Sequence, residues 1–148
     1  MKQFLAKILV LLAMIVVGMN ALSQTPQIEI DDSLPSAVSS VLYGVNHFVE
    51  DLDKAQDVQS FNNVLGAFGA YFETYHDETP IDEETRQLFT KANRNIITSV
   101  ITNMMRVTGK EVSPSELNVA IDKTVSELDN RLARCKTVGE YTSNALLF

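Results

Sequence analysis

Apolar residues recur at spacings of three and four along most of the chain after residue 34, a pattern typical of helices that bury one face. The first run predicts a helix over about residues 35–56, with Pro35 at its first position because the fixed φ angle of proline suits a helix start. The second run predicts a helix that follows Asp57, whose side chain can cap it, and that ends near His76. The apolar positions of this second helix are Phe61, Val64, Leu65, Phe68, Tyr71, Phe72 and Tyr75.

Two further runs predict helices in the second half of the chain. The third helix is expected to begin at Thr79-Pro80, with acidic residues at 82–84 in its first turn, where the helix dipole favours them, and to end at Gly109. The segment Ser113-Pro114-Ser115-Glu116 has the spacing of a capping box and predicts the start of the fourth helix. Cys135 lies on the apolar face of this helix, so we expect a buried structural thiol.

A second capping box, Thr137-x-x-Glu140, predicts a short fifth helix over about residues 138–147. The connections between the runs are short, which favours helices that alternate in direction. We therefore predict an all-α fold: a four-helix bundle in up-down order with a short fifth C-terminal helix. The bundle domain would span residues 34–148, after an extended lead-in at residues 24–33.

Residues 1–23 have the pattern of a cleaved signal peptide. Two lysines precede an apolar run over residues 8–18, and the small residues Ala21 and Ser23 then stand before Gln24, where signal peptidase would cut. The alternative is an uncleaved membrane anchor, but the apolar run is shorter than the roughly 20 residues that a span requires. We expect an exported protein, periplasmic or extracellular, with no membrane association once the leader is removed.

The predicted mature chain is strongly acidic. All 19 acidic residues and 10 of the 12 basic residues follow residue 23, so a chain that begins at Gln24 carries a net charge of −9. This charge argues against binding to nucleic acid or to anionic membranes, because both would repel it. It permits a basic protein partner or a cation, and the alternative is that it serves solubility alone.

Residues that could carry catalysis or bind a metal are few. The chain has one cysteine and two histidines, and it contains neither a nucleophile elbow nor a phosphate-binding loop. Glu73-x-x-His76 matches half of a di-iron carboxylate motif, but His47-x-x-Glu50 has the reverse order and cannot complete it. Met104, Met105 and His47 are haem ligands by residue type only. We therefore expect no enzyme activity, no metal and no cofactor, with Glu73 and His76 as the weak metal candidates.

A group of small residues, Gly66-Ala67-x-Gly69-Ala70, lies within the second predicted helix. Each glycine costs a helix about 1 kcal/mol relative to alanine, which suggests that something approaches this backbone closely. We expect tight packing against a neighbouring helix, for instance at Gly44. The alternative is a groove for a small apolar ligand or cofactor between Gly66 and Tyr75. Its candidate lining residues are Gly66, Phe68, Gly69, Ala70, Tyr71 and Phe72.

The segment from Phe48 to Phe89 combines a helix ending in Asp-Lys-Ala, a cap, Phe-x-x-Val-Leu and then Thr-Pro-Ile-Asp-Glu-Glu. In these features it resembles small secreted all-helical proteins of Gram-negative bacteria, many of which have no assigned function. The resemblance implies secretion and a helical fold, and it carries no activity. The sequence therefore predicts an exported, non-catalytic module that binds a protein, with a ligand-binding bundle as the alternative.

Overall fold

The structure is a computed structural model that describes residues 25–73 and 75–146, so the predicted leader lies outside the described residues. Within these residues the chain is all-helical, as predicted, and an isolated bridge between Pro80 and Thr137 is its one β-type pairing. The helices are α3 (Ser36–Lys54), α4 (Val58–Glu73), α5 (Glu83–Thr108), α6 (Pro114–Ala133), α7 (Val138–Glu140) and the π-helical turn η1 (Tyr141–Ala145).

Several predicted helix ends are confirmed by their hydrogen bonds. Asp57 caps α4, because its Oδ1 accepts a hydrogen bond of 2.8 Å from the backbone N–H of Ser60. Both capping boxes form, at residues 113–116 and at residues 137–140. Gly109 ends α5 in the left-handed region with a φ angle of 70°, which glycine adopts without the steric penalty of a side chain. These features are local in sequence, which is why the residue pattern predicts them.

The predicted start of the third helix is wrong. Asp82 caps α5 by accepting a hydrogen bond of 2.8 Å from the backbone N–H of Thr85, and Glu83 is the first helical residue. Residues 79–81 instead form two backbone hydrogen bonds of 2.9 Å with residues 136–138. A contact between segments far apart in sequence therefore replaces the local start that the threonine and proline suggested.

Two other boundaries also differ from the prediction. Pro35 lies just before α3, with a ψ angle of 144°, and not at its first helical position. The second helix ends at Glu73 and does not reach His76. Beyond this end, the Tyr75 hydroxyl donates a hydrogen bond of 3.2 Å to the carbonyl of Ala37. This contact ties the segment after α4 to the start of α3.

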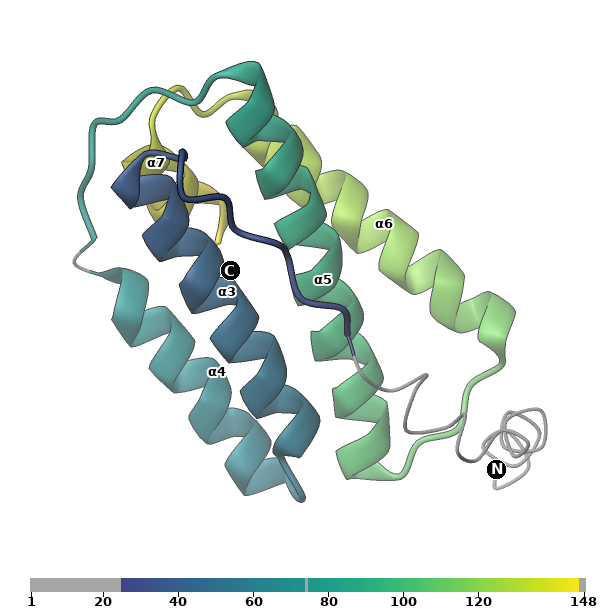
Figure 1. Cartoon of the computed structure of the whole chain (residues 1–148). Coiled ribbons are helices and arrows are strands. Elements are labelled where there is room, and N and C mark those ends of the chain that lie inside the picture. The colour runs from purple at the N-terminus through teal and green to yellow at the C-terminus, as the bar shows by residue number, and fades with distance from the viewer. Residues whose placement is uncertain (1–24, 74, 147–148) are drawn as a thin grey trace.

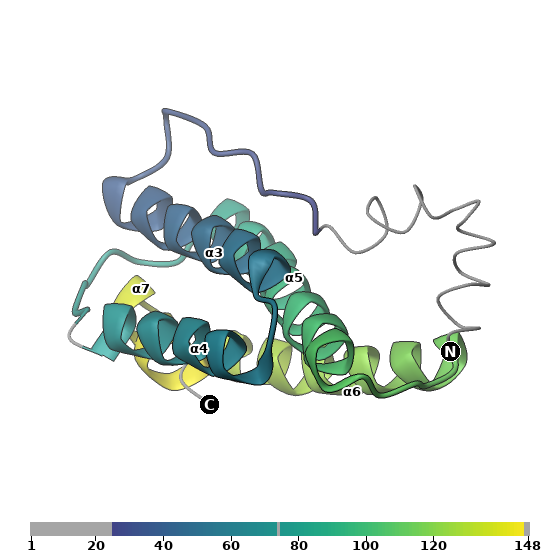
Figure 2. The ribbon, with the colours of Figure 1, turned by 90° about the horizontal axis from the view of Figure 1, so that it is seen from below.

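The four long helices run in alternating directions (Figure 1). Helix α5 packs against α3, α4 and α6, and the C-terminal turn η1 packs against both α6 and α4. Figure 2 shows α7 and α4 on one side of α3, and the extended lead-in on the other. The C-terminal segment is therefore an integral part of the packing.

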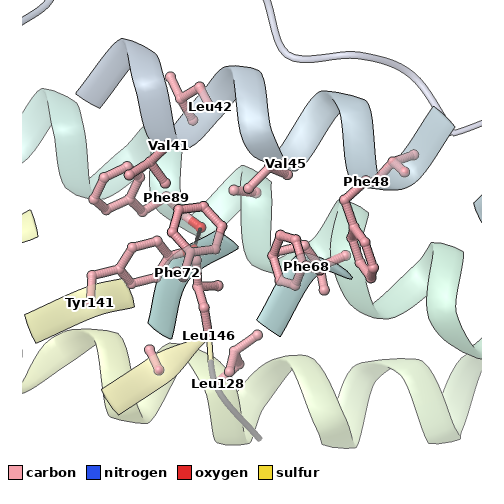
Figure 3. Packing of buried hydrophobic residues seen from close by; sticks show 14 of the residues in the cluster. Val41, Leu42, Val45, Phe48, Phe68, Phe72, Phe89, Leu128, Tyr141 and Leu146 are labelled. Atoms are coloured by element: carbon pink, nitrogen blue, oxygen red, sulfur yellow. Dashed lines mark hydrogen bonds between the residues drawn. The ribbon is translucent and has the colours of Figure 1, made fainter. Parts of the chain in front are cut away.

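One continuous apolar core joins these helices. The rings of Phe72, Phe89 and Tyr141 are fully buried at one end of it, and Phe48 stacks on Phe68 at the other (Figure 3). Phe89 and Tyr141 stack with their ring centroids 4.1 Å apart. Tyr141 thus anchors the C-terminal segment to α5 through an aromatic contact that contributes beyond the burial of area.

A buried polar chain accompanies the Tyr141 ring. The Tyr141 hydroxyl donates a hydrogen bond of 2.7 Å to Oδ1 of Asn93, and Nδ2 of Asn93 donates one of 2.9 Å to Oδ1 of Asp129. No buried side-chain nitrogen or oxygen lacks a partner in the described part of the chain. An unpaired buried polar atom costs free energy of folding. These hydrogen bonds therefore fix the position of Tyr141 between α5 and α6.

The free energy of unfolding should fall as the pH rises from about 9 to about 11. Burial, with Asp129 nearby, raises the pKa of Tyr141 well above its usual value, and burial also raises the pKa of Cys135. The folded chain keeps these protons at a pH where the unfolded chain loses them, so stability is complete below the usual pKa values and is lost above them. Tyr141→Phe should be less stable at pH 7, and the gap to the wild type should narrow with rising pH. Urea unfolding from pH 7 to 11 measures this, and a constant gap would contradict it.

Candidate functional site

The six residues of the predicted ligand groove do not share one face of α4. Phe68 and Phe72 point into the core, where their ring centroids lie 5.1 Å apart (Figure 3). Gly66 and Ala70 lie on the outer face, and Tyr71 beside them is 53% exposed. The structure therefore separates the two aromatic rings from the small residues. Whether a ligand binds the outer face stays a prediction.

The predicted close helix contact at the small residues is wrong within the described chain. A Cβ atom added at Gly66 or Gly69 would meet no atom within 4 Å. The predicted partner position, Gly44 of α3, does make a close approach to α4, because a Cβ atom there would lie 3.2 Å from ring carbons of both Tyr71 and Phe72. The glycine that allows α3 and α4 to approach is thus on α3, and it faces the aromatic end of α4.

The weak metal candidates Glu73 and His76 are both exposed, and only Glu73 belongs to α4. The helical i, i+3 spacing that would aim both side chains at one ion is therefore not formed. No group of three or more histidine, cysteine, aspartate or glutamate side chains among the described residues could hold a metal ion.

The haem candidates also fail to meet in the core. The side chain of His47 is 75% exposed, and its Nε2 lies 3.4 Å from a carboxylate oxygen of Asp51. Met104 is exposed, and Met105 is partly exposed. The arrangement supplies no axial pair that faces a common interior space.

Cys135 is buried, as its position on the apolar face predicts. Its Sγ lies 3.3 Å from the carbonyl oxygen of Arg131 and donates a hydrogen bond to it, and burial raises the pKa of the thiol. The carbonyls of Leu132 and Cys135 accept hydrogen bonds of 2.7 Å and 3.0 Å from the guanidinium group of Arg86. Arg86 therefore binds the carbonyl end of α6, where a cation is favourable. The cysteine belongs to this structural junction.

Acidic side chains lie at the surface throughout the molecule. None of the 19 is buried, and Glu50 and Asp122 are among those that form an ion pair with a lysine or arginine. Residues 77–84 comprise the connection that leads into α5 and the first two residues of that helix. We call this segment the acidic loop, and it lies at the end of the molecule where α3 and α5 begin (Figure 1). The carboxylates of the acidic loop are Asp77, Glu78, Asp82, Glu83 and Glu84.

The acidic loop is held in place through its backbone and its two aspartates. Asp77 accepts a hydrogen bond of 2.8 Å from the backbone N–H of Gly139 through its carbonyl, while its side chain accepts one of 2.7 Å from Thr79. Asp82 is engaged as the cap of α5. The three glutamates form no ion pair with the described residues. The sequence pattern explained only residues 82–84, as favourable for the helix dipole, and gave no signal for the anchored loop.

The structure also contains a hollow of about 350 Å³ between the bend of the lead-in and the first turns of α3. Two carboxylates, four hydroxyl groups and two aliphatic side chains line it. Sequence analysis missed this hollow because its residues come from two segments that have no common pattern. The lining residues are Ile30, Asp31, Asp32, Leu34, Ser36, Ser39, Ser40 and Tyr43.

No helix of the described residues is long and apolar enough to cross a membrane. The chain was compared with models of protein families, with curated proteins and with solved structures, and no match was found in any of the three.

Proposed function

We propose that this chain is an exported, non-catalytic module that binds a basic protein through the acidic loop. Its scaffold is a four-helix bundle in up-down order, completed by the C-terminal segment. The observation that carries this proposal is the set of glutamates of the acidic loop, Glu78, Glu83 and Glu84, which are exposed and form no ion pair with the described chain. Gln87 donates a hydrogen bond of 3.4 Å to Glu83, and the loop presents its negative charge without an ion-pair partner among the described residues.

The physical argument concerns the electric field of the whole molecule. A net charge of −9 after removal of the leader attracts basic surfaces and repels phosphate backbones and anionic membranes. Rigid backbone contacts hold the acidic loop, so little conformational entropy would be lost when a partner binds it. A basic protein of the same compartment, periplasmic or extracellular, is the partner that fits this field.

Neutralising the acidic loop should abolish binding of the partner. The test variant is Glu78→Gln, Glu83→Gln and Glu84→Gln, which keeps the Asp82 cap. The matched control changes three exposed carboxylates elsewhere, Glu29→Gln, Glu73→Gln and Glu127→Gln. Proteins captured from the native envelope fraction at about 0.1 M salt should bind the wild type and the control but not the loop variant. The captured proteins should also dissociate from the wild type near 1 M salt, because the Debye length there is about 3 Å and charge–charge attraction is screened.

Equal capture by the loop variant and the control would contradict the proposed interface. A small molecule that copurifies with the wild type, in place of a protein, would favour the ligand-binding alternative. Both variants lose the same number of negative charges, so the comparison separates position from net charge.

Export is tested separately. The exported chain should begin at or within about two residues of Gln24, given the precision with which cleavage sites are predicted. Mass spectrometry of the intact protein from the envelope or the medium measures this. An N-terminus at Met1 in that fraction would contradict signal-peptide cleavage.

A further inference from the structure

The lead-in forms an extended segment, residues 25–30, which we call the strap. It lies along α3 and α5 on the side opposite α7 (Figures 1 and 2). Of its residues only Ile28 is buried, at 8% exposure, and Ile30 packs partly against the core. A turn closed by a hydrogen bond of 3.1 Å from the Leu34 N–H to the Asp31 carbonyl links the strap to α3.

The strap is held chiefly by side chains of α3 and α5 that bind its main chain. The amide group of Asn46 accepts a hydrogen bond from the Ile28 N–H and donates one to the Ile28 carbonyl, both of 2.9 Å. Asn95 donates a hydrogen bond of 2.8 Å to the carbonyl of Pro26. The Thr25 N–H donates one of 3.2 Å to Asp53. No backbone–backbone hydrogen bond joins the strap to a helix in the described chain.

The strap shares two features with extended peptides bound by other proteins, although side chains here replace the backbone of a sheet edge. Hydrogen bonds to the main chain provide affinity for any extended segment, and pockets for alternate side chains provide selectivity. Here Ile28 points inward, whereas its neighbours Gln27 and Glu29 are exposed. We propose that Asn46, Glu50, Asp53 and Asn95, together the strap surface, form a receptor for an extended peptide of another protein, with the strap as its intramolecular competitor.

The charges around the strap surface indicate which peptide fits. The Gln27 side chain donates a hydrogen bond of 3.2 Å to the carboxylate of Glu50, which also accepts one of 3.0 Å from Lys54. The carboxylate of Asp53 accepts only uncharged donors from the described chain. A basic residue at the position of Gln27 would bring a positive charge to the Glu50 carboxylate, where the strap offers an amide. The favoured ligand therefore has a basic residue followed by an aliphatic one. This choice of ligand rests on the proposed function, in which the partner is basic.

The strap should open without unfolding the helices. Its one buried side chain is a small part of a core that the helices otherwise complete, and segments with few buried contacts open locally. Closure is nevertheless favoured, because a short tether gives the strap an effective concentration in the millimolar range. A peptide in trans therefore binds the wild-type chain weakly and a chain with a released strap more tightly.

The test uses the full mature chain with Ile28→Asp, which places a carboxylate in an apolar site and releases the strap. The probe is a fluorescein-labelled peptide with the sequence of residues 24–31. Fluorescence anisotropy should show binding at least about tenfold tighter than to the wild type, because the competitor is removed. A probe with Arg in place of Gln27 should bind a further two- to fivefold tighter, which is the gain in affinity expected from one exposed ion pair. This gain should disappear at high salt, because salt screens the ion pair.

Asn46→Ala in the Ile28→Asp chain should weaken binding by roughly tenfold or more, since two hydrogen bonds to the peptide are lost. Asn63→Ala on the exposed face of α4 is the matched control and should change nothing. Absence of saturable binding up to about 1 mM, a competitor concentration like that of the strap, would overturn the proposal. Binding that ignores Asn46 would overturn it too.

Two further results are informative. Should Ile28→Asp prevent folding, a protease site inserted at residues 31–33 and cut after folding releases the strap from an otherwise wild-type chain, with the same expected binding. Dimers of the wild type that disappear in this cut chain would show exchange of straps between copies and would overturn the assignment to another protein.

Loss of peptide binding with intact capture by the acidic loop would contradict this inference alone. The reverse result would contradict the proposed function alone.

Discussion

Phe72→Ala is expected to lower the free energy of unfolding by about 3–5 kcal/mol, the range found when a buried phenylalanine is truncated. The Phe72 ring is completely buried, and it meets the rings of Phe68, Tyr71 and Tyr75 edge-on at centroid distances of 5.1, 4.7 and 5.9 Å. Its loss would leave a cavity beside Gly44, where a Cβ atom would lie 3.2 Å from the Phe72 ring. Urea unfolding followed by circular dichroism measures the change.

Tyr71→Ala is the matched control for this prediction. Tyr71 is the neighbouring residue on the same helix, but its side chain is 53% exposed, so truncation leaves little enclosed space. A loss below about 1.5 kcal/mol is expected, mostly from the aromatic contact with Phe72. Equal losses for the two variants would show that the buried and exposed faces of α4 are assigned incorrectly.

Gly139→Ala is expected to destabilise the chain by about 1–3 kcal/mol or more, although alanine favours helices. A Cβ atom at this position would lie 2.6 Å from the carbonyl oxygen and 2.8 Å from the nitrogen of Asp77. These are main-chain atoms, which cannot rotate away as the end of a side chain could. The contact between the acidic loop and α7 must therefore widen, and the hydrogen bond from the Gly139 N–H would weaken.

Gly66→Ala provides the control of opposite sign. Nothing lies within 4 Å of a Cβ atom at Gly66, so the substitution should stabilise α4 by about 0.5–1 kcal/mol through helix propensity alone. Thermal unfolding of both variants, each compared with the wild type, measures the two changes. A destabilised Gly66→Ala protein would indicate a close contact on the outer face of α4 that the isolated chain does not make.

The Gly139 contact also bears on the proposed partner. Asp77 belongs to the acidic loop, so a displaced Asp77 backbone moves the carboxylates that we propose as the interface. Gly139→Ala should therefore reduce capture of the basic partner, whereas Gly66→Ala should leave it unchanged.

The sequence alone determined the helices and most of their ends. The periodicity predicts α3, α4, α5 and α6 because one face of each must be buried, and the caps at Asp57, Ser113, Thr137 and Gly109 are confirmed. Each of these caps depends on groups within a few residues of one another. Local chemistry of this kind is fully present in the amino-acid order.

The candidate site was predicted less completely. The acidity of residues 24–148 follows from composition, but the sequence divided residues 77–84 between a helix end and a helix start. It also paired Gly44 with the small residues around Gly66, whereas in the structure Gly44 approaches the rings of Tyr71 and Phe72. Helical periodicity gives the side of a helix that is buried but does not give the residue that its neighbour approaches.

The places where the chain departs from these local rules are set by contacts between segments that lie far apart in sequence. Thr79-Pro80 predicts a helix start, but Pro80 lies opposite Thr137. Asn46, which the sequence analysis did not single out, holds Ile28 through two hydrogen bonds. These pairings join residues 57 and 18 positions apart. They depend on how the helices pack in space, which no single segment specifies, because the partner groups become neighbours only after the core has formed.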